Sequence, residues 1–282
     1  MKKNRIPIII VFVAMLTGCV GFKFTYNNLD WIVPWYVDDY LALTDQQEEQ
    51  FDQAFGKLWA WHRAAEMPKY ANLLSALESD ISKQAITQQK LTNYRDQMKN
   101  FYRETAKQAI ISSADLLASI SDEQISEIKL VIEDERLEFE DYIKETNTKS
   151  RTKKRIRARE KEYRKWFGKL TKKQKKLIQT WGNEIETSLE YRYEYFTNSR
   201  AAFLKALSNR SNKELMLSEL LYLVDERDEF HNANYLEIRD RNRQRVDKLL
   251  LDLQDSLTKK QKRRLLNRIE NYRELIEDLS NK

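Results

Sequence analysis

The sequence predicts an all-α fold, an elongated bundle of about seven long helices whose two halves are candidates for duplication. Turn-forming residues are scarce, since the 282 residues include 5 glycines and 3 prolines. After Pro68 there is no proline, and the only glycines are Gly168 and Gly182. A sheet protein of this length would need many more such residues at its turns. The scarcity therefore favours long helices joined by tight connections.

Apolar residues recur at intervals close to 3.6, for example at Ile125, Ile128, Ile132 and Phe139. This is the period of one helix face. A helix of forty residues would be about 60 Å long, so the bundle should be elongated. We expect helices at residues 44–66, 69–83, 87–118, 121–167 with a possible break near Asn147, 171–208, 212–255 and 258–280.

Four of the expected helices begin with one pattern: an aliphatic residue, Ser or Thr, two polar residues and Gln. The pattern is typical of a capping box, in which the hydroxyl accepts from the third helical amide and the Gln side chain returns to the capping residue's amide. Replacing such a hydroxyl by alanine should cost about 1 kcal/mol. The expected pairs are Thr44 with Gln47, Ser121 with Gln124, Thr171 with Gln174, and Thr258 with Gln261.

The positions of these starts suggest an internal repeat. Leu43 and Ile120 are 77 residues apart, and Leu170 and Leu257 are 87 apart. Capping signals also arise independently in all-helical proteins, so duplication and coincidence both stay open. We divide the helical body into residues 44–147, an N-terminal half, and residues 148–282, a basic helix with the C-terminal half.

Residues 1–18 have the order of an export signal peptide, in which a basic start precedes a short apolar run. The basic residues are Lys2, Lys3 and Arg5, and the apolar run covers residues 6–16. Crossing a bilayer as a helix takes about 20 apolar residues. We therefore interpret this segment as a leader that is removed.

Leu16, Thr17, Gly18 and Cys19 resemble the lipobox of bacterial lipoproteins. The resemblance implies cleavage before Cys19, with diacylglycerol and an N-acyl chain such as palmitate attached to it. Several acyl chains would anchor the protein stably. Because Val20 rather than aspartate follows, the resemblance favours the periplasmic face of the outer membrane over the inner membrane. The alternative is an ordinary cysteine in a leader.

Residues 19–43 form an aromatic-rich tether after the expected lipid anchor. Its rings could lie among lipid headgroups, where amphipathic aromatic side chains are favoured. We expect instead that the tether packs across the helical body. The rings are Phe22, Phe24, Tyr26, Trp31, Trp35, Tyr36 and Tyr40.

Charge is unevenly distributed along the chain. The formal net charge is +6, but the leader supplies three of these positive charges, which together with export argues against nucleic acid as a partner. Residues 149–176 carry a net charge of +13 and residues 122–145 a net charge of −7. Either the basic helix is solvated and balanced by the acidic one, or it binds anionic partners such as lipid phosphates or acidic protein segments. The candidate patch is Lys153, Lys154, Arg155, Arg157, Arg159, Arg164 and Lys165.

The sequence gives little indication of a catalytic or metal-binding site. The chain has 2 histidines, His62 and His231, and 1 cysteine, too few for a structural zinc site. Paired Glu-x-x-His motifs of a di-iron bundle are missing, as are nucleophile elbows and phosphate loops. We expect no catalytic residue, metal or cofactor other than the covalent lipid.

Two family resemblances add to this. The Leu-Thr-x-x-Gln matches at residues 43–47, 170–174 and 257–261 resemble the motif of the Spy/CpxP periplasmic chaperones, which implies client binding. The run Tyr26-Asn27-Asn28-Leu29-Asp30-Trp31, followed by residues 38–40 and 43–44, resembles the opening of an uncharacterised family of proteobacterial lipoproteins. That second resemblance implies no activity.

The leading hypothesis is a non-enzymatic, lipid-anchored envelope protein that binds protein clients or anionic envelope components. One alternative is a structural scaffold at the outer membrane. A less favoured one is an enzyme that acts on cell-wall or lipid substrates. The sequence does not indicate the oligomeric state.

Overall fold

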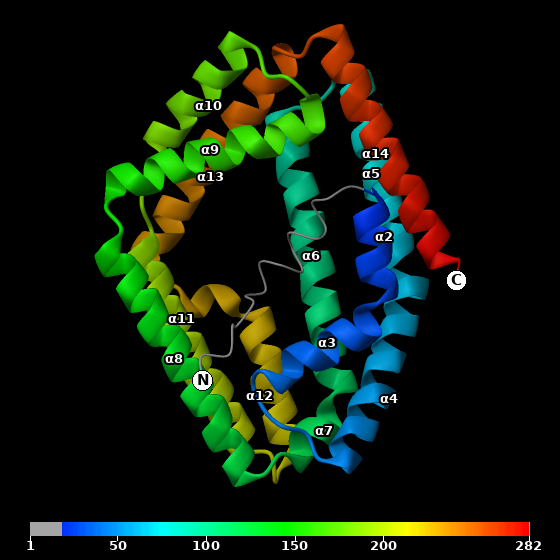
Figure 1. Cartoon of the computed structure of the whole chain (residues 1–282), viewed down its shortest axis with the longest axis vertical. Helices are drawn as coiled ribbons and strands as arrows, with labels where there is room; N and C mark the ends of the chain where they lie inside the picture. Colours follow the sequence, from blue (N-terminus) through cyan, green and yellow to red (C-terminus); the bar gives the residue numbers. More distant parts are fainter. Residues whose placement is uncertain (1–18, 282) are drawn as a thin grey trace.

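The structure, a computed structural model, describes residues 19–281, and its regular elements there are all helical. The all-α prediction is confirmed. The helices trace a four-sided outline, elongated along one axis and crossed by α6 (Gln88–Ser112) (Figure 1). Among the described helices none is both long and apolar enough to cross a membrane. Residues 1–18, with the expected cleavage residues Leu16, Thr17 and Gly18, lie outside the described part, as does the thiol of Cys19.

The expected number of about seven helices is too low, because several expected helices are interrupted. The break near Asn147 is present, and further breaks fall at residues 113, 185–188 and 226–232. Besides α6, the helices are α2 (Cys19–Asn27), α3 (Leu29–Asp38), α4 (Asp45–Trp61), α5 (Met67–Ser82), α7 (Ala114–Ser119), α8 (Asp122–Glu145), α9 (Thr148–Phe167), α10 (Lys172–Glu184), α11 (Leu189–Ser208), α12 (Lys213–Asp225), α13 (Ala233–Asp255) and α14 (Lys259–Ser280), with a π-helical turn His62–Glu66 and a 3₁₀ turn Arg227–Phe230.

At Pro68 the expected break is absent, and α4 continues through the π-helical turn into α5. Proline lacks the amide hydrogen that an α-helix needs at that position. Here the Met67 amide donates to the His62 carbonyl, five residues earlier, which is the wider π-helical spacing. Pro68 then lies in the first turn of α5, where a missing amide hydrogen is tolerated.

The break between α10 and α11 has a tertiary cause, because no proline or glycine occurs at residues 185–188. The Glu186 amide donates to the Asn242 side-chain oxygen at 3.0 Å, and the Asn242 side-chain amide donates to the Glu186 carbonyl at 3.0 Å. These bonds to α13 replace bonds that a continuous helix would have made. Nothing in the sequence of residues 185–188 indicates these bonds.

Three apolar cores hold the described helices together. The first joins α8, α11 and α12 through residues such as Ile128, Leu207 and Met216. The second joins α9, α10 and α13, with Ile178 and Leu253 fully buried, and the third joins α2, α5 and α14. The first and third cores both combine helices from residues 19–147 with helices from residues 148–282. Burial therefore ties the two parts of the chain into one body.

Both glycines after Pro68 have a steric role. Gly168, between α9 and α10, has φ of +80°, a conformation that residues with a side chain rarely adopt. At Gly182 of α10 an added Cβ would lie 2.2 Å from Cγ1 of Ile156 on α9. A side chain there would force the two helices apart.

Candidate functional site

Each of the four expected helix starts forms a complete capping box. The hydroxyls of Thr44, Ser121, Thr171 and Thr258 accept from the third amide of α4, α8, α10 and α14, and each motif's Gln side chain accepts from the capping residue's amide. The Gln side chains are almost completely buried, with 0–9% of their surface exposed. Capping alone does not require such burial, so these side chains have a second role.

Gln47 and Gln124 bind each other across the N-termini of α4 and α8. Their side-chain amides exchange hydrogen bonds, Nε2 of Gln47 to Oε1 of Gln124 at 3.0 Å and the reverse at 2.7 Å. Each Nε2 also donates to a carbonyl just before the other helix, Gln47 to Ser119 and Gln124 to Ala42. We call these two helix starts, residues 44–48 and 121–124, the acidic corner. It borders a cleft of about 380 Å³.

Gln174 and Gln261 repeat this arrangement across the N-termini of α10 and α14. Their Nε2–Oε1 distances are 2.9 and 3.0 Å. Each Nε2 again donates to the carbonyl two residues before the partner's capping residue, Gln174 to Ser256 and Gln261 to Lys169. We call residues 171–174 and 258–261 the basic corner. The two corners lie at opposite ends of the long axis (Figure 1).

The first turns at the two corners differ in charge. The acidic corner carries Asp45 and Glu48 on α4 and Asp122 and Glu123 on α8. Acidic side chains at helix N-termini are stabilised by the partial positive charge of the helix dipole. The basic corner has no acidic residue in these turns and instead carries four exposed lysines, Lys172, Lys173, Lys259 and Lys260.

The basic corner thus combines two helix N-termini with lysine side chains. A helix N-terminus attracts anions and repels cations. No ion pair within residues 19–281 engages any of these four lysines. Four positive charges therefore lie where the helix dipoles disfavour them, and this arrangement suits a negatively charged partner.

Three of the seven candidate patch residues on α9 are exposed and unpaired within residues 19–281, and the other four are half-buried or contact side chains or backbone of the protein itself. Lys153, Lys154 and Arg157 are exposed and enter no ion pair within residues 19–281, and Lys165 is half-buried. The guanidinium of Arg159 lies over the Trp181 ring at 5.1 Å, and Arg164 lies 2.6 Å from Glu160. The exposed cations continue toward the basic corner through Lys161, and together we call Lys153, Lys154, Arg157 and Lys161 the α9 face.

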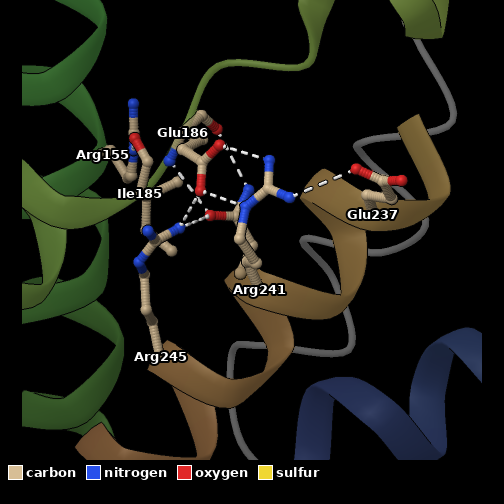
Figure 2. A network of polar contacts seen from close by, with 7 residues as sticks. Arg155, Ile185, Glu186, Glu237, Arg241 and Arg245 are labelled. Atoms are coloured by element: carbon tan, nitrogen blue, oxygen red, sulfur yellow. Dashed lines mark hydrogen bonds and ion pairs between the residues drawn. The ribbon is translucent and has the colours of Figure 1, made fainter. Parts of the chain in front are cut away.

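Arg155 belongs to a polar network that fastens the turn between α10 and α11 (Figure 2). It donates to the Ile185 carbonyl at 2.9 Å. The neighbouring Glu186 accepts from Arg241 at 2.7 and 2.9 Å and from Arg245 at 2.6 Å, and these hydrogen bonds lower the pKa of Glu186 to about 2. Arg155 therefore contacts the protein's own backbone.

Acidic residues of α8 form ion pairs with basic residues on α8 itself and on α11. Arg136 lies 2.7 Å from Glu133 and 3.1 Å from Glu140, and Arg200 of α11 lies 3.9 Å from Glu135. The basic α9 packs mainly on α10 and α14. Although consecutive in the chain, α8 and α9 extend from a shared bend in different directions (Figure 1).

The aromatic tether has an inner and an outer set of rings. Tyr26 is buried in the third core, and Tyr40 donates to Oε1 of Glu135 on α8 at 2.6 Å. Phe24, Trp31 and Trp35 remain exposed, at 62%, 57% and 49%. The tether therefore packs across the body in part and leaves three large rings uncovered.

Both histidines are enclosed by aromatic rings. His62 lies between the hydroxyls of Tyr26 and Tyr70, at 3.0 and 3.1 Å, and burial lowers its pKa. His231 stacks between Tyr195 and Tyr235, and burial, aided by Arg227, lowers its pKa to about 4. Within residues 19–281 no group of His, Cys, Asp and Glu is arranged to hold a metal ion.

Sequence reasoning missed Lys259 and Lys260 as part of the cationic surface, because they lie far along the chain from α9. A signal was present, since residues 170–174 and 257–261 have the identical sequence Leu-Thr-Lys-Lys-Gln. What local sequence could not show is that the two Gln side chains pair and so bring the lysines to one end of the molecule.

Comparison with known proteins gives a family but no activity. Searches of curated proteins and of solved structures each found no match. A family model described as a family of unknown function, DUF6279, matches residues 39–236. The match includes three of the four capping boxes and α9, while the Tyr26–Trp31 run and α14 lie outside it. Since it covers well over half of the chain, the protein belongs to this uncharacterised family, DUF6279.

Proposed function

We propose that this chain is a non-enzymatic envelope lipoprotein, held by lipid on Cys19 at the periplasmic face of the outer membrane, that binds acidic segments of protein clients. The binding surface is the basic corner with the α9 face. One observation carries the proposal: lysines at the starts of α10 and α14 oppose both helix dipoles and have no acidic partner within residues 19–281.

The energetics support an external partner. Each cation in the first turn of a helix is unfavourable by about 0.3–1 kcal/mol at low ionic strength, and an anion bound there reverses the sign. Uncompensated charge also attracts an oppositely charged partner over roughly 10 Å at 0.1 M salt. Carboxylates of an unfolded acidic segment would satisfy both the lysines and the helix ends.

Sequence resemblances are consistent with this function. The Leu-Thr-x-x-Gln pattern is similar to the motif of the Spy/CpxP chaperones, which bind unfolded proteins. Leu16 to Cys19 match a lipobox.

The client-binding part is tested by aggregation of reduced α-lactalbumin, an acidic unfolded polypeptide, in the presence of the lipidated chain in neutral phosphatidylcholine vesicles. Light scattering should fall at low salt and recover at high salt, and reduced lysozyme, a basic client, should aggregate unhindered. A variant with glutamine at Lys172, Lys173, Lys259 and Lys260 should lose most of the suppression. A control with the same charge change at four other exposed lysines should keep it; these are Lys57, Lys129, Lys144 and Lys205.

Two results would contradict the proposal. If α-lactalbumin still aggregates at several-fold molar excess of the wild-type chain, the proposed client binding is wrong. Equal loss in the variant and its control would assign the effect to net charge rather than to the basic corner.

The lipid anchor is tested separately by mass spectrometry of protein recovered from its native host. The expected species starts at Cys19 and carries the mass of three acyl chains. An intact leader, or a mature amino terminus without acyl mass, would overturn the anchor.

A scaffold is the second candidate function, and the positions of the corners favour it. The acidic and basic corners lie at opposite ends of the long axis (Figure 1). A body of this kind could hold two envelope components of opposite charge. Crosslinking in cells would then recover one defined partner at each corner, and the α-lactalbumin assay would show no suppression.

A further inference from the structure

The tether leaves an aromatic surface that no part of residues 19–281 covers. Phe24 on α2 is 62% exposed, and Trp31 and Trp35 on α3 are 57% and 49% exposed. The helix α3 has the sequence LDWIVPWYVD, yet it has no buried residue. Exposed apolar surface of this kind usually marks a contact with a partner or a membrane. We call these three rings the aromatic face.

The aromatic face is held in place at both of its ends. Tyr26 of α2 is buried in the third core, and Lys23 lies 2.7 Å from Asp278 of α14. Beyond α3, Tyr40 donates to Glu135 of α8 at 2.6 Å and shares a hydrogen bond with Tyr36. The segment crosses in front of α6 between these attachments (Figure 1). Its exposure therefore belongs to the folded body.

Position along the chain favours a lipid surface as the occupant. Helix α2 begins at Cys19, and Phe24 follows five residues later, a rise of about 8 Å along a helix. Trp31 and Trp35 are four residues apart, so both project from one side of α3. Tryptophan is enriched at membrane interfaces, where its apolar ring is buried and its N–H stays near water.

Charge on α3 indicates which kind of lipid contact this is. Asp30 and Asp38 are exposed on the same helix as the tryptophans, and α3 has no basic residue. Carboxylates gain nothing from anionic headgroups, so the contact must come from the rings. It should be shallow, insensitive to salt and independent of anionic lipid, unlike any contact made by the basic corner.

We propose that the aromatic face is a second membrane contact, in which Phe24, Trp31 and Trp35 insert among phospholipid headgroups beside the lipid anchor. The inference rests on the proposed lipidation of Cys19. The anchor would confine the chain to the bilayer, and the rings would fix which side of the body faces it. Both charged corners would then remain in the aqueous phase, available to partners.

The test uses the lipidated chain in phosphatidylcholine vesicles that carry bromine close to the headgroup, which quenches tryptophan emission at short range. We expect the wild-type protein to be quenched, and Trp31→Phe/Trp35→Phe to lose most of that quenching. A matched control that also removes two tryptophans, Trp61→Phe/Trp166→Phe, should retain it. High salt should leave the wild-type quenching unchanged.

The outcomes separate this inference from the proposed anchor. Wild-type protein that floats with the vesicles but is not quenched, or whose quenching survives in Trp31→Phe/Trp35→Phe, would overturn the aromatic contact and leave the anchor standing. Quenching abolished by high salt would assign the contact to the cationic surface and likewise overturn the inference. Wild-type protein that does not float would overturn both.

Discussion

The acidic and basic corners contain the same set of hydrogen bonds on helix starts of opposite charge. In each, two capping Gln side chains exchange hydrogen bonds and donate to the carbonyls that precede the partner helix. Asp and Glu follow at the starts of α4 and α8, whereas Lys follows at the starts of α10 and α14. The shared bonds hold pairs of helices together, and they do so with either charge. The lysines are therefore not explained by the needs of the fold.

Breaking the Gln pairs should have the largest effect, and an equal one at the two corners. Gln124→Leu or Gln261→Leu leaves a carbonyl and a capping amide without partners, and the facing Gln side chain keeps its bonds to the backbone. Each unsatisfied buried group costs about 1–3 kcal/mol. Urea unfolding should show the loss at both corners, while Gln46→Leu and Gln179→Leu, at exposed positions, should change stability little. A loss at one corner only would show that the two sets of bonds are not equivalent.

Removing the capping hydroxyls should have a smaller effect, again at both corners. Thr44→Ala and Thr258→Ala each remove one acceptor from a helix N-terminus, which costs about 1 kcal/mol. The midpoint of urea unfolding should fall in both, and Thr180→Ala, inside α10 and exposed, serves as the control. Loss confined to Thr258→Ala would mean that the acids of α4 cap that helix without Thr44.

These capping boxes could be predicted because their bonds lie within four consecutive residues. Thr171 and Gln174 meet whenever the helix forms, so the pattern alone gives the helix start. The pairing of Gln174 with Gln261 joins residues 87 positions apart. The residues next to either Gln in the sequence do not indicate this pairing. For the same reason the lysines of α14 could not be assigned to the surface of α9 and α10.

The breaks in the expected helices follow the same rule. Asn147 marks its own break, because its side chain accepts from the Ser150 amide and caps α9. The break at Glu186 depends on Asn242, on another helix, and Pro68 causes no break because the preceding turn widens into a π-helix. Periodicity gives the class and the helix faces, and a local cap such as Asn147 can be recognised in the sequence, whereas a break held by tertiary hydrogen bonds, as at Glu186, cannot.

Exchanging the charges should separate stability from function at the basic corner. Lys172→Glu and Lys259→Glu place an acid where the helix dipole favours it, so each should stabilise the protein by about 0.3–1 kcal/mol at low salt. Asp45→Lys should destabilise it by a similar amount, and Asp122→Lys by more, because it also removes the ion pair of Asp122 with Arg210 at 2.7 Å. Urea unfolding at low and high salt measures this, since salt should shrink all four changes.

The same two Lys→Glu variants should lose suppression of α-lactalbumin aggregation while being more stable. Destabilisation by Lys172→Glu would show that the lysine has a structural partner. Retained suppression would show that the partner binds elsewhere.

Lowering the pH should destabilise the acidic corner but not the basic corner. This is the smallest effect expected. Glu123 accepts hydrogen bonds from its own backbone amide and from Ser121, which hold its pKa below the ordinary value near 4.5. A carboxyl whose pKa is lower in the folded state contributes stability that is complete above the unfolded pKa and is lost as pH falls through the folded pKa. The first turns of α10 and α14 contain no carboxylate to titrate.

Hydrogen exchange can compare the two corners in one sample. The Gln124 amide, bonded to Ser121, and the Gln261 amide, bonded to Thr258, occupy the same place in their capping boxes. Between about pH 6 and pH 3 the protection factor of Gln124 should fall while that of Gln261 stays level. Glu123→Gln should remove the pH dependence at Gln124. A parallel fall at both amides would mean that acid acts on the whole fold, for example through His231, whose pKa of about 4 lies in the same range.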